Sequence, residues 1–161
     1  MGIGNELRMD DAVGLMVVQA LGKGKKCGNI DFYGLGDDLE ALPILISGKP
    51  KAAVVDALQS GRRPGRIRTI RADPACLPAG GEMYSLHELE LIWQIGYAYQ
   101  NGFQGELLLI GIETARVEPG IGLSPELEKL FPRIVKNVGN ILASFSSGPK
   151  TGKGASRSRD P

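Results

Sequence analysis

The chain has 161 residues, 42% of them hydrophobic, which is enough for one well-formed core but too few for two ordinary domains. Its formal net charge of +1 produces no overall field that would indicate nucleic acid or an anionic membrane as a partner. No run approaches the roughly 18 apolar residues of a membrane span, and the N-terminus lacks a signal-peptide pattern, so we expect no membrane or nucleic-acid partner.

The N-terminal stretch predicts an amphipathic helix after a Gly-rich turn. Its apolar residues fall at i, i+3, i+4, i+7 and i+8, which is a single helical face. They are Val13, Met16, Val17, Ala20 and Leu21. Gly22 is expected to end this helix. Gly2 and Gly4 are spaced as in a dinucleotide fingerprint, but Leu7 stands where that motif requires a third Gly, so phosphate binding is disfavoured.

Two adjacent aspartates, Asp10 and Asp11, stand directly before this helix. An Asp at such a position usually caps the helix, because its carboxylate accepts hydrogen bonds from free backbone N–H groups. Only one of the two can be the cap, and the other is then free to project into the crevice where a parallel sheet keeps its active site. The pair therefore predicts a carboxylate site at the start of the helix.

The next apolar run, from Asn29 to Tyr33, predicts a second strand, which Gly34 and Gly36 break. A short helix is expected to follow through the apolar residues from Leu39 to Ile46. Pro43 lies inside this segment and should cost or bend a helical turn.

A continuous apolar run from Ala52 to Val55 is typical of a strand that helices cover on both faces. It ends directly in Asp56. A carboxylate at the C-terminal end of a buried strand is costly unless it is paired, solvated or bound to a metal. Asp56 is therefore either a site residue or an ordinary turn-forming Asp just past the strand, and both interpretations stay open.

The segment from Arg66 to Arg71 predicts a basic strand. Its arginines, together with Arg62 and Arg63, could form a docking patch for an acidic partner. Charged edge strands are, however, a common protection against unwanted strand pairing, so we favour a solvated edge. An irregular loop is expected from Ala72 to Met83.

A capping box formed by Ser85 and Glu88 predicts the start of another helix. Its apolar face is expected to consist of Leu86, Leu89, Ile92 and Trp93. His87, the single histidine, lies in the first turn, where the positive end of the helix favours the neutral imidazole that ligates metals. The alternative is an ordinary surface histidine.

The run from Leu107 to Ile112 predicts a second buried strand, and Ser124 with Pro125 predicts the start of the last helix. The face of this helix is expected to consist of Leu127, Leu130, Phe131, Ile134, Val138, Ile141 and Leu142. Residues 1–145 should form one domain and residues 146–161 a disordered tail, because the tail has little apolar content. Cys27 and Cys76 match no metal or redox spacing, so reduced thiols in a cytoplasmic protein are expected.

Taken together, these residues resemble the hydrogenase maturation endopeptidases. This family trims the C-terminal extension from the precursor of the [NiFe] hydrogenase large subunit. Four blocks in the family's order carry the resemblance over roughly residues 1 to 145. They are Gly2-Ile3-Gly4-Asn5 with Asp10-Asp11-Ala12-Val13-Gly14, Val54-Val55-Asp56-Ala57, Ser85-Leu86-His87-Glu88-Leu89, and Gly111-Ile112 with the segment from Val117 to Pro125.

The resemblance implies both the fold and the site residues. The fold would be a three-layer α/β/α sandwich around a mixed five-stranded sheet in the order 2-1-3-5-4, with strand 4 antiparallel. By motif position, Asp11, Asp56 and His87 would bind the metal and take part in catalysis. Relatives have several apolar residues before the first glycine turn, where this chain has only Ile3. A truncated first strand and a natural start upstream of Met1 are therefore expected.

The metal would be nickel that the hydrogenase precursor already carries, so the enzyme would recognise its loaded substrate by ligating that ion. Two carboxylate oxygens and one imidazole nitrogen leave coordination positions for water or substrate. The peptide bond could be cut by a metal-polarised water or carbonyl, or with a carboxylate as general base, and both routes stay open. The protein is expected to be a monomer.

Two alternatives to a maturation peptidase are weighed. A non-catalytic nickel-binding maturation factor could use the same three ligands. A peptidyl-tRNA hydrolase has a similar fold and opening glycine turn, but its catalytic histidine belongs soon after that turn, where this chain has no histidine.

Overall fold

The computed structural model of the chain describes residues 1–24, 29–72 and 86–148, without the side chains of residues 86–88. Both cysteines, Ser85 of the expected capping box, almost all of the expected loop from Ala72 to Met83 and residues 149–161 of the expected tail lie outside these ranges. Residues 146 and 147, where the tail was expected to start, still belong to the last helix. Among the described helices, none has the length and apolar character needed to cross a membrane.

The centre of the fold is a five-stranded sheet in the order β2-β1-β3-β5-β4. Its strands are β1 (Gly2–Ile3), β2 (Gly34–Gly36), β3 (Lys51–Leu58), β4 (Ile67–Ala72) and β5 (Glu106–Glu113). All neighbouring pairs are parallel except β4 and β5, which are antiparallel. The strand order and the antiparallel edge strand that the family resemblance implied are therefore confirmed.

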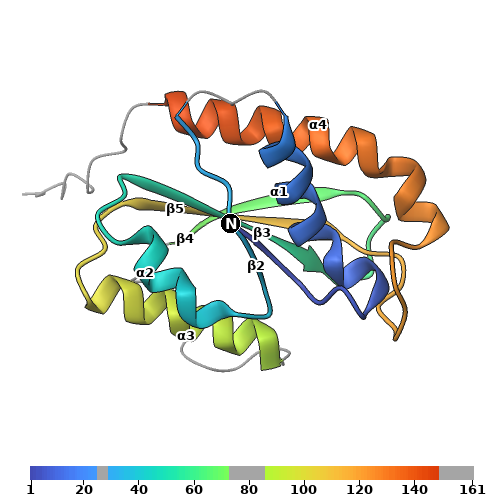
Figure 1. The fold of residues 1–161 in the computed structure, drawn as a ribbon, viewed down its shortest axis with the longest axis horizontal. Coiled ribbons are helices and arrows are strands. Elements are labelled where there is room, and N and C mark those ends of the chain that lie inside the picture. Colours follow the sequence, from blue (N-terminus) through green and yellow to red (C-terminus); the bar gives the residue numbers. More distant parts are fainter. Residues whose placement is uncertain (25–28, 73–85, 149–161) are drawn as a thin grey trace, which may run out of the picture.

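Helices cover both faces of this sheet and complete the three-layer sandwich (Figure 1). The helical segments are η1 (Met9–Ala12), α1 (Val13–Lys23), η2 (Leu39–Ala41), α2 (Leu42–Ile46), α3 (Leu86–Gln100) and α4 (Pro125–Ser147), where η denotes a 3-10 helix. Helices α1 and α4 lie on one face, and α2 and α3 lie on the other. Each face has its own apolar cluster, and β3 alternates between them, with Val55 in the α1/α4 cluster and Val54 in the α2/α3 cluster.

The expected second strand is displaced: β2 begins at Gly34, after the apolar run from Asn29 to Tyr33. The reason is pairing with β1, because the backbone N–H of Gly2 donates to the carbonyl of Tyr33 at 2.8 Å and that of Gly4 to Gly36 at 3.1 Å. The apolar residues of the earlier run instead pack against the α1/α4 cluster from outside the sheet. The apolar pattern identified the segment, but it did not show which of the neighbouring residues pair with β1.

Two further element boundaries differ from expectation. Helix α1 continues through Gly22 and ends at Lys23, with Gly24 as its C-cap residue. Pro43 neither bends nor interrupts a helix, because the chain first forms the 3-10 turn η2 and Pro43 occupies the first turn of α2. In the first turn a proline loses no hydrogen bond, since that N–H has no helical partner.

Helix α3 packs through a different face from the expected one. Among its described side chains, Leu91, Ile95 and Ala98 are buried, whereas Leu89 and Trp93 are exposed, Trp93 to 76%. The expected face was wrong because α3 has apolar residues on several sides, and periodicity alone does not tell which side meets the sheet. Helix α4 follows expectation better: Ser124 caps it by accepting from the N–H of Leu127, and the residues that it buries all belong to the expected face.

Candidate functional site

Asp10 lies fully buried where the turn after β1 meets the start of α4. Its carboxylate accepts hydrogen bonds from the backbone N–H groups of Ala115 and Arg116, each at 2.9 Å. It also accepts from the N–H of Ser124 at 2.6 Å and from the Ser124 hydroxyl at 2.8 Å. Asp10 therefore fastens η1 to the loop after β5 and to the first residue before α4.

This arrangement corrects the expectation that one of the two aspartates caps the first helix. Both aspartates lie within the 3-10 turn η1, which leads directly into α1, so the N-cap residue of α1 is Ala12, which makes no side-chain hydrogen bond. Asp10 instead binds residues more than 100 positions away along the chain. Its four donors occupy both carboxylate oxygens, so Asp10 serves the structure.

Asp11 has a partly exposed side chain on the outer side of the same turn. Its Oδ2 accepts the backbone N–H of Asn5 at 3.1 Å, and the Asn5 side chain donates to Oδ2 of Asp37 at 2.8 Å. Among the described residues, Oδ1 of Asp11 accepts no hydrogen bond. Asn5 thus orients Asp11 while leaving one of its oxygens available to a ligand.

Asp56 lies within β3, in register with Gly111 of β5, so of the two interpretations the turn-forming Asp just past the strand is excluded. The strand is longer because its ladder with β5 continues to Leu58. Side chains alternate along a strand, so Asp56 projects to the same face as Val54, the face that α2 and α3 cover. Its Oδ1 accepts the backbone N–H of Ala57 at 2.7 Å.

Asp11 and Asp56 belong to one corner of the sheet because α1 packs very closely on β3. A Cβ added to Gly14 would lie 2.3 Å from the carbonyl oxygen of Val55, so only glycine permits this approach. Asp11 precedes Gly14 by three residues and Asp56 follows Val55 directly. The turn η1 also contacts β3.

His87 is the second residue of α3, and its side chain lies outside the described part of the structure. Figure 1 shows that α3 begins on the side of the molecule toward which the arrow of β3 points, and that η1 leads into α1 on that same side. Position 87 precedes Leu91 by one helical turn, and at Leu91 α3 is already buried against the sheet. The three predicted positions thus belong to three segments that lie toward the same end of the sheet.

Glu113, the last residue of β5, is a second buried carboxylate, only 1% exposed. It accepts hydrogen bonds from the backbone N–H groups of Ser60 and Arg62 at 2.7 and 2.9 Å, and from the Ser60 hydroxyl at 2.8 Å. Burial by itself would raise the pKa of Glu113, but these hydrogen bonds, together with the Arg62 charge, lower the pKa below its ordinary value. Glu113 fixes the turn after β3.

Sequence reasoning assigned no role to Glu113 or Asn5, and it treated Asp10 only as one of two candidates for the helix cap. Asn5 stands within a quoted motif block, so its position was a usable signal. The partners of the two buried carboxylates lie about 50 to 115 residues away along the chain, and no local pattern indicates them. Within the described residues, which leave out the His87 side chain, no three His, Cys, Asp or Glu side chains form a metal-binding group.

Comparison with known proteins shows which family the chain belongs to. A family model described as hydrogenase maturation protease matches residues 15–141, which is most of the chain. The chain belongs to the hydrogenase maturation protease family. The matched range includes Asp56 and His87, and it begins four residues after Asp11. A search of curated protein sequences found no match.

Solved structures of hydrogenase maturation proteases are similar over nearly the whole fold. The maturating endopeptidase HybD from E. coli is 25% identical, with a TM-score of 0.74 and coverage of 91% of each chain. The maturation protease HycI from Thermococcus kodakarensis KOD1 is 26% identical, with a TM-score of 0.70 and coverage of 88% of each chain. Members of this family are peptidases, so the chain is assigned to an enzyme class and not only to a fold.

Proposed function

We propose that this maturation protease removes the C-terminal extension from the nickel-loaded precursor of a [NiFe] hydrogenase large subunit, in the cytoplasm. The observation that supports the proposal is that η1, the C-terminal end of β3 and the first turn of α3 all lie toward the same end of the sheet in a chain of this family (Figure 1). Those segments contain Asp11, Asp56 and His87, the three positions that the family motif makes ligands and catalytic groups.

Nickel enters this proposal as part of the substrate. Oδ1 of Asp11 has no hydrogen-bond donor among the described residues, and carboxylate oxygens with an imidazole nitrogen suit a divalent transition ion. Asn5 holds Asp11 in place through its backbone N–H, so the carboxylate meets a ligand without a large loss of side-chain freedom. An unloaded precursor would lack the ion that these groups bind.

Peptide hydrolysis at this edge requires an activated water or a polarised carbonyl. Asp11 and Asp56 supply carboxylates for a general base, and a metal ion in the substrate would supply Lewis acidity. In the first route one of the two carboxylates must lie within hydrogen-bond reach of the attacking water, and in the second the metal ion must lie beside the scissile carbonyl. Strands β1, β3 and β5 are parallel, so their C-terminal ends lie side by side and can present several catalytic groups to one substrate.

The test is incubation of the purified protein with nickel-loaded and nickel-free precursor, read by mass spectrometry. Wild type should shorten only the loaded precursor, and His87→Ala should reduce the rate at least about a hundredfold, as removal of a catalytic group or ligand does. Glu90→Ala is the matched control, because Glu90 is an exposed residue of the same helix close to its start.

Two results would contradict the proposal. The first is normal processing by His87→Ala. The second is tight binding of the loaded precursor by wild type with no change in mass, which would indicate a non-catalytic nickel-binding maturation factor.

A further inference from the structure

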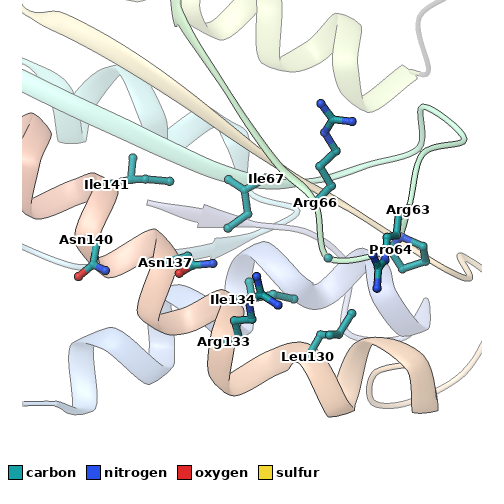
Figure 2. A pocket seen from close by; sticks show the side chains of 11 residues that line it. Arg63, Pro64, Arg66, Ile67, Leu130, Arg133, Ile134, Asn137, Asn140 and Ile141 are labelled. Atoms are coloured by element: carbon teal, nitrogen blue, oxygen red, sulfur yellow. The ribbon is translucent and has the colours of Figure 1, made fainter.

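A groove of about 600 Å³ lies between α4 and the loop that precedes β4. Its apolar floor is formed by Ile67 from the start of β4 and by Leu130, Ile134 and Ile141 from α4 (Figure 2). Arg63 stands on the loop side and Arg133 on the helix side. We call this feature the Arg63/Arg133 groove. The site proposed above does not use it.

The two arginines carry charge that the described part of the chain does not neutralise. Both side chains are exposed, and the ion pairs found among the described residues include neither of them. None of the residues lining the groove is acidic, and Asn137 and Asn140 add amide groups along its helical wall. Arg66 also borders the groove, but Figure 2 shows its side chain leading away from α4.

The walls of the groove are fixed before any ligand arrives. Gly65, with a φ of +75°, lies so close to α4 that an added Cβ would be 2.9 Å from Cδ1 of Leu130. The backbone N–H of Gly65 donates to the carbonyl of Glu113 at 2.8 Å, and the N–H of Glu113 donates to the carbonyl of Arg66 at 2.9 Å. A preformed wall reduces the entropy that a ligand must lose on binding.

The dimensions of the groove suit an extended peptide. From Leu130 to Ile141 the helical wall spans eleven residue-to-residue steps, which at 1.5 Å per step is about 16 Å. An extended chain rises roughly 3.3 Å per residue, so about five residues would occupy it. Carboxylates on such a peptide would meet the two guanidinium groups, and alternate apolar side chains would meet the floor.

The groove reaches the same edge of the sheet as the proposed active site. Ile67 of β4 and Ala57 of β3 both pair with Ile112 of β5, so they lie two strand spacings apart, roughly 10 Å. Ala57 follows Asp56 directly. The groove lies on the α1/α4 face of the sheet, whereas Asp56 points to the α2/α3 face. An extended peptide therefore needs at least about three residues between the segment that is bound in the groove and the peptide bond that is cleaved at Asp56.

We propose that the Arg63/Arg133 groove binds an acidic, partly apolar segment of the hydrogenase precursor while the cleavage site lies at the carboxylate edge. This inference rests on the proposed function. The chain's own C-terminal segment does not fit the requirement, because residues 149–161 contain Lys150, Lys153, Arg157 and Arg159 against a single Asp160. Charge complementarity therefore favours the substrate protein over the tail.

The first test uses two labelled synthetic peptides, one alternating Glu with Leu and one alternating Gln with Leu, in fluorescence anisotropy with the full chain. The acidic peptide should bind more tightly, and each of Arg63→Gln and Arg133→Gln should weaken it about three- to tenfold, the range expected for charge-assisted contacts near the surface. Lys136→Gln is the matched control, since Lys136 is an exposed cation of α4 outside the groove and should change binding less than twofold.

The second test measures processing of the nickel-loaded precursor. Arg63→Gln and Arg133→Gln should raise KM and leave kcat unchanged, because they remove binding remote from the reacting bond. If wild type processes the precursor but both variants retain its KM, the groove inference is overturned and the proposed function stands.

If wild type does not process the precursor but binds the acidic peptide through the two arginines, the proposed function fails and the peptide selectivity of the groove stands. Equal binding of the acidic and neutral peptides would overturn the inference. So would equally tight, Arg-dependent binding of a single-stranded oligonucleotide, which would indicate a general anion site.

Discussion

Asp10 and Asp11 are neighbours in the chain, but the fold gives them opposite environments. Asp10 is buried and accepts four hydrogen bonds from residues 115–124. Asp11 is partly exposed and, among the described residues, accepts one, from the N–H of Asn5. Adjacent residues in a 3-10 turn point in directions about 120° apart, so one faces the interior of the molecule and the other the rim of the sheet.

The difference separates structural carboxylates from candidate catalytic ones. A buried carboxylate whose oxygens are all engaged has no capacity to bind a metal or to accept a proton from water. Glu113 resembles Asp10 in this respect, since both of its oxygens accept hydrogen bonds from the turn after β3. Asp11 retains an oxygen without a donor among the described residues. Three substitutions test this contrast.

The largest effect on stability is expected from Asp10→Asn. Whichever way the new amide is oriented, its NH₂ group faces at least one of the N–H groups that now donate to Asp10, so buried donors lose their acceptor. We expect the free energy of unfolding to fall by about 2 to 4 kcal/mol. Urea denaturation measures it, and a loss no greater than that of Asp11→Asn would remove the distinction between the two residues.

Glu113→Gln should have an intermediate effect that depends on pH. The pKa of Glu113 is lowered in the folded state, so its stabilising contribution is complete above the ordinary value of 4.5 and is lost as the pH falls through the lower folded value. Near neutral pH we expect the substitution to lower the free energy of unfolding by about 1 to 3 kcal/mol. Denaturation curves measured from pH 7 to pH 3 should show that the difference in unfolding free energy between wild type and variant becomes smaller as the pH falls. A difference that stays constant would contradict this reasoning.

The smallest effect on stability is expected from Asp11→Asn, the same chemical change one residue further along. The amide oxygen of the variant can still accept a hydrogen bond from the backbone N–H of Asn5, so the free energy of unfolding should change by less than about 0.5 kcal/mol. Nickel-dependent binding of the precursor should nevertheless weaken, because the negative charge is gone. Calorimetric titration with loaded precursor measures this, and unchanged affinity would exclude Asp11 as a ligand.

The helices show how far sequence patterns reach. In α4 the apolar residues form one stripe, and the residues that the helix buries, Leu127, Ile134, Val138 and Leu142, all belong to the predicted face. In α3 the apolar residues surround the helix, and the structure buries Leu91 and Ile95 instead of the predicted face. Periodicity identifies a buried face only where the other faces are polar.

The motif blocks identified the segments that contain the candidate site residues, but they did not show which neighbouring residues hold those segments in place. They named Asp11, Asp56 and His87, and the segments that contain these residues lie toward the same end of the sheet. Whether the three side chains bind one ion stays a prediction. The same blocks contain Asp10 and Asn5, whose roles depend on partners that the sequence places far away or leaves unspecified.

The sequence by itself determined the α/β class, the buried strands β3 and β5, the capped start of α4 and, through the motif resemblance, the strand order. These features depend on local apolar pattern, on capping residues or on residues adjacent in the chain. Tertiary structure alone decided the register that starts β2 at Gly34, the face on which α3 packs and the choice of Asp10 as the buried aspartate. Each of these depends on hydrogen bonds or contacts between segments distant in sequence, and such partners become neighbours only when the chain folds.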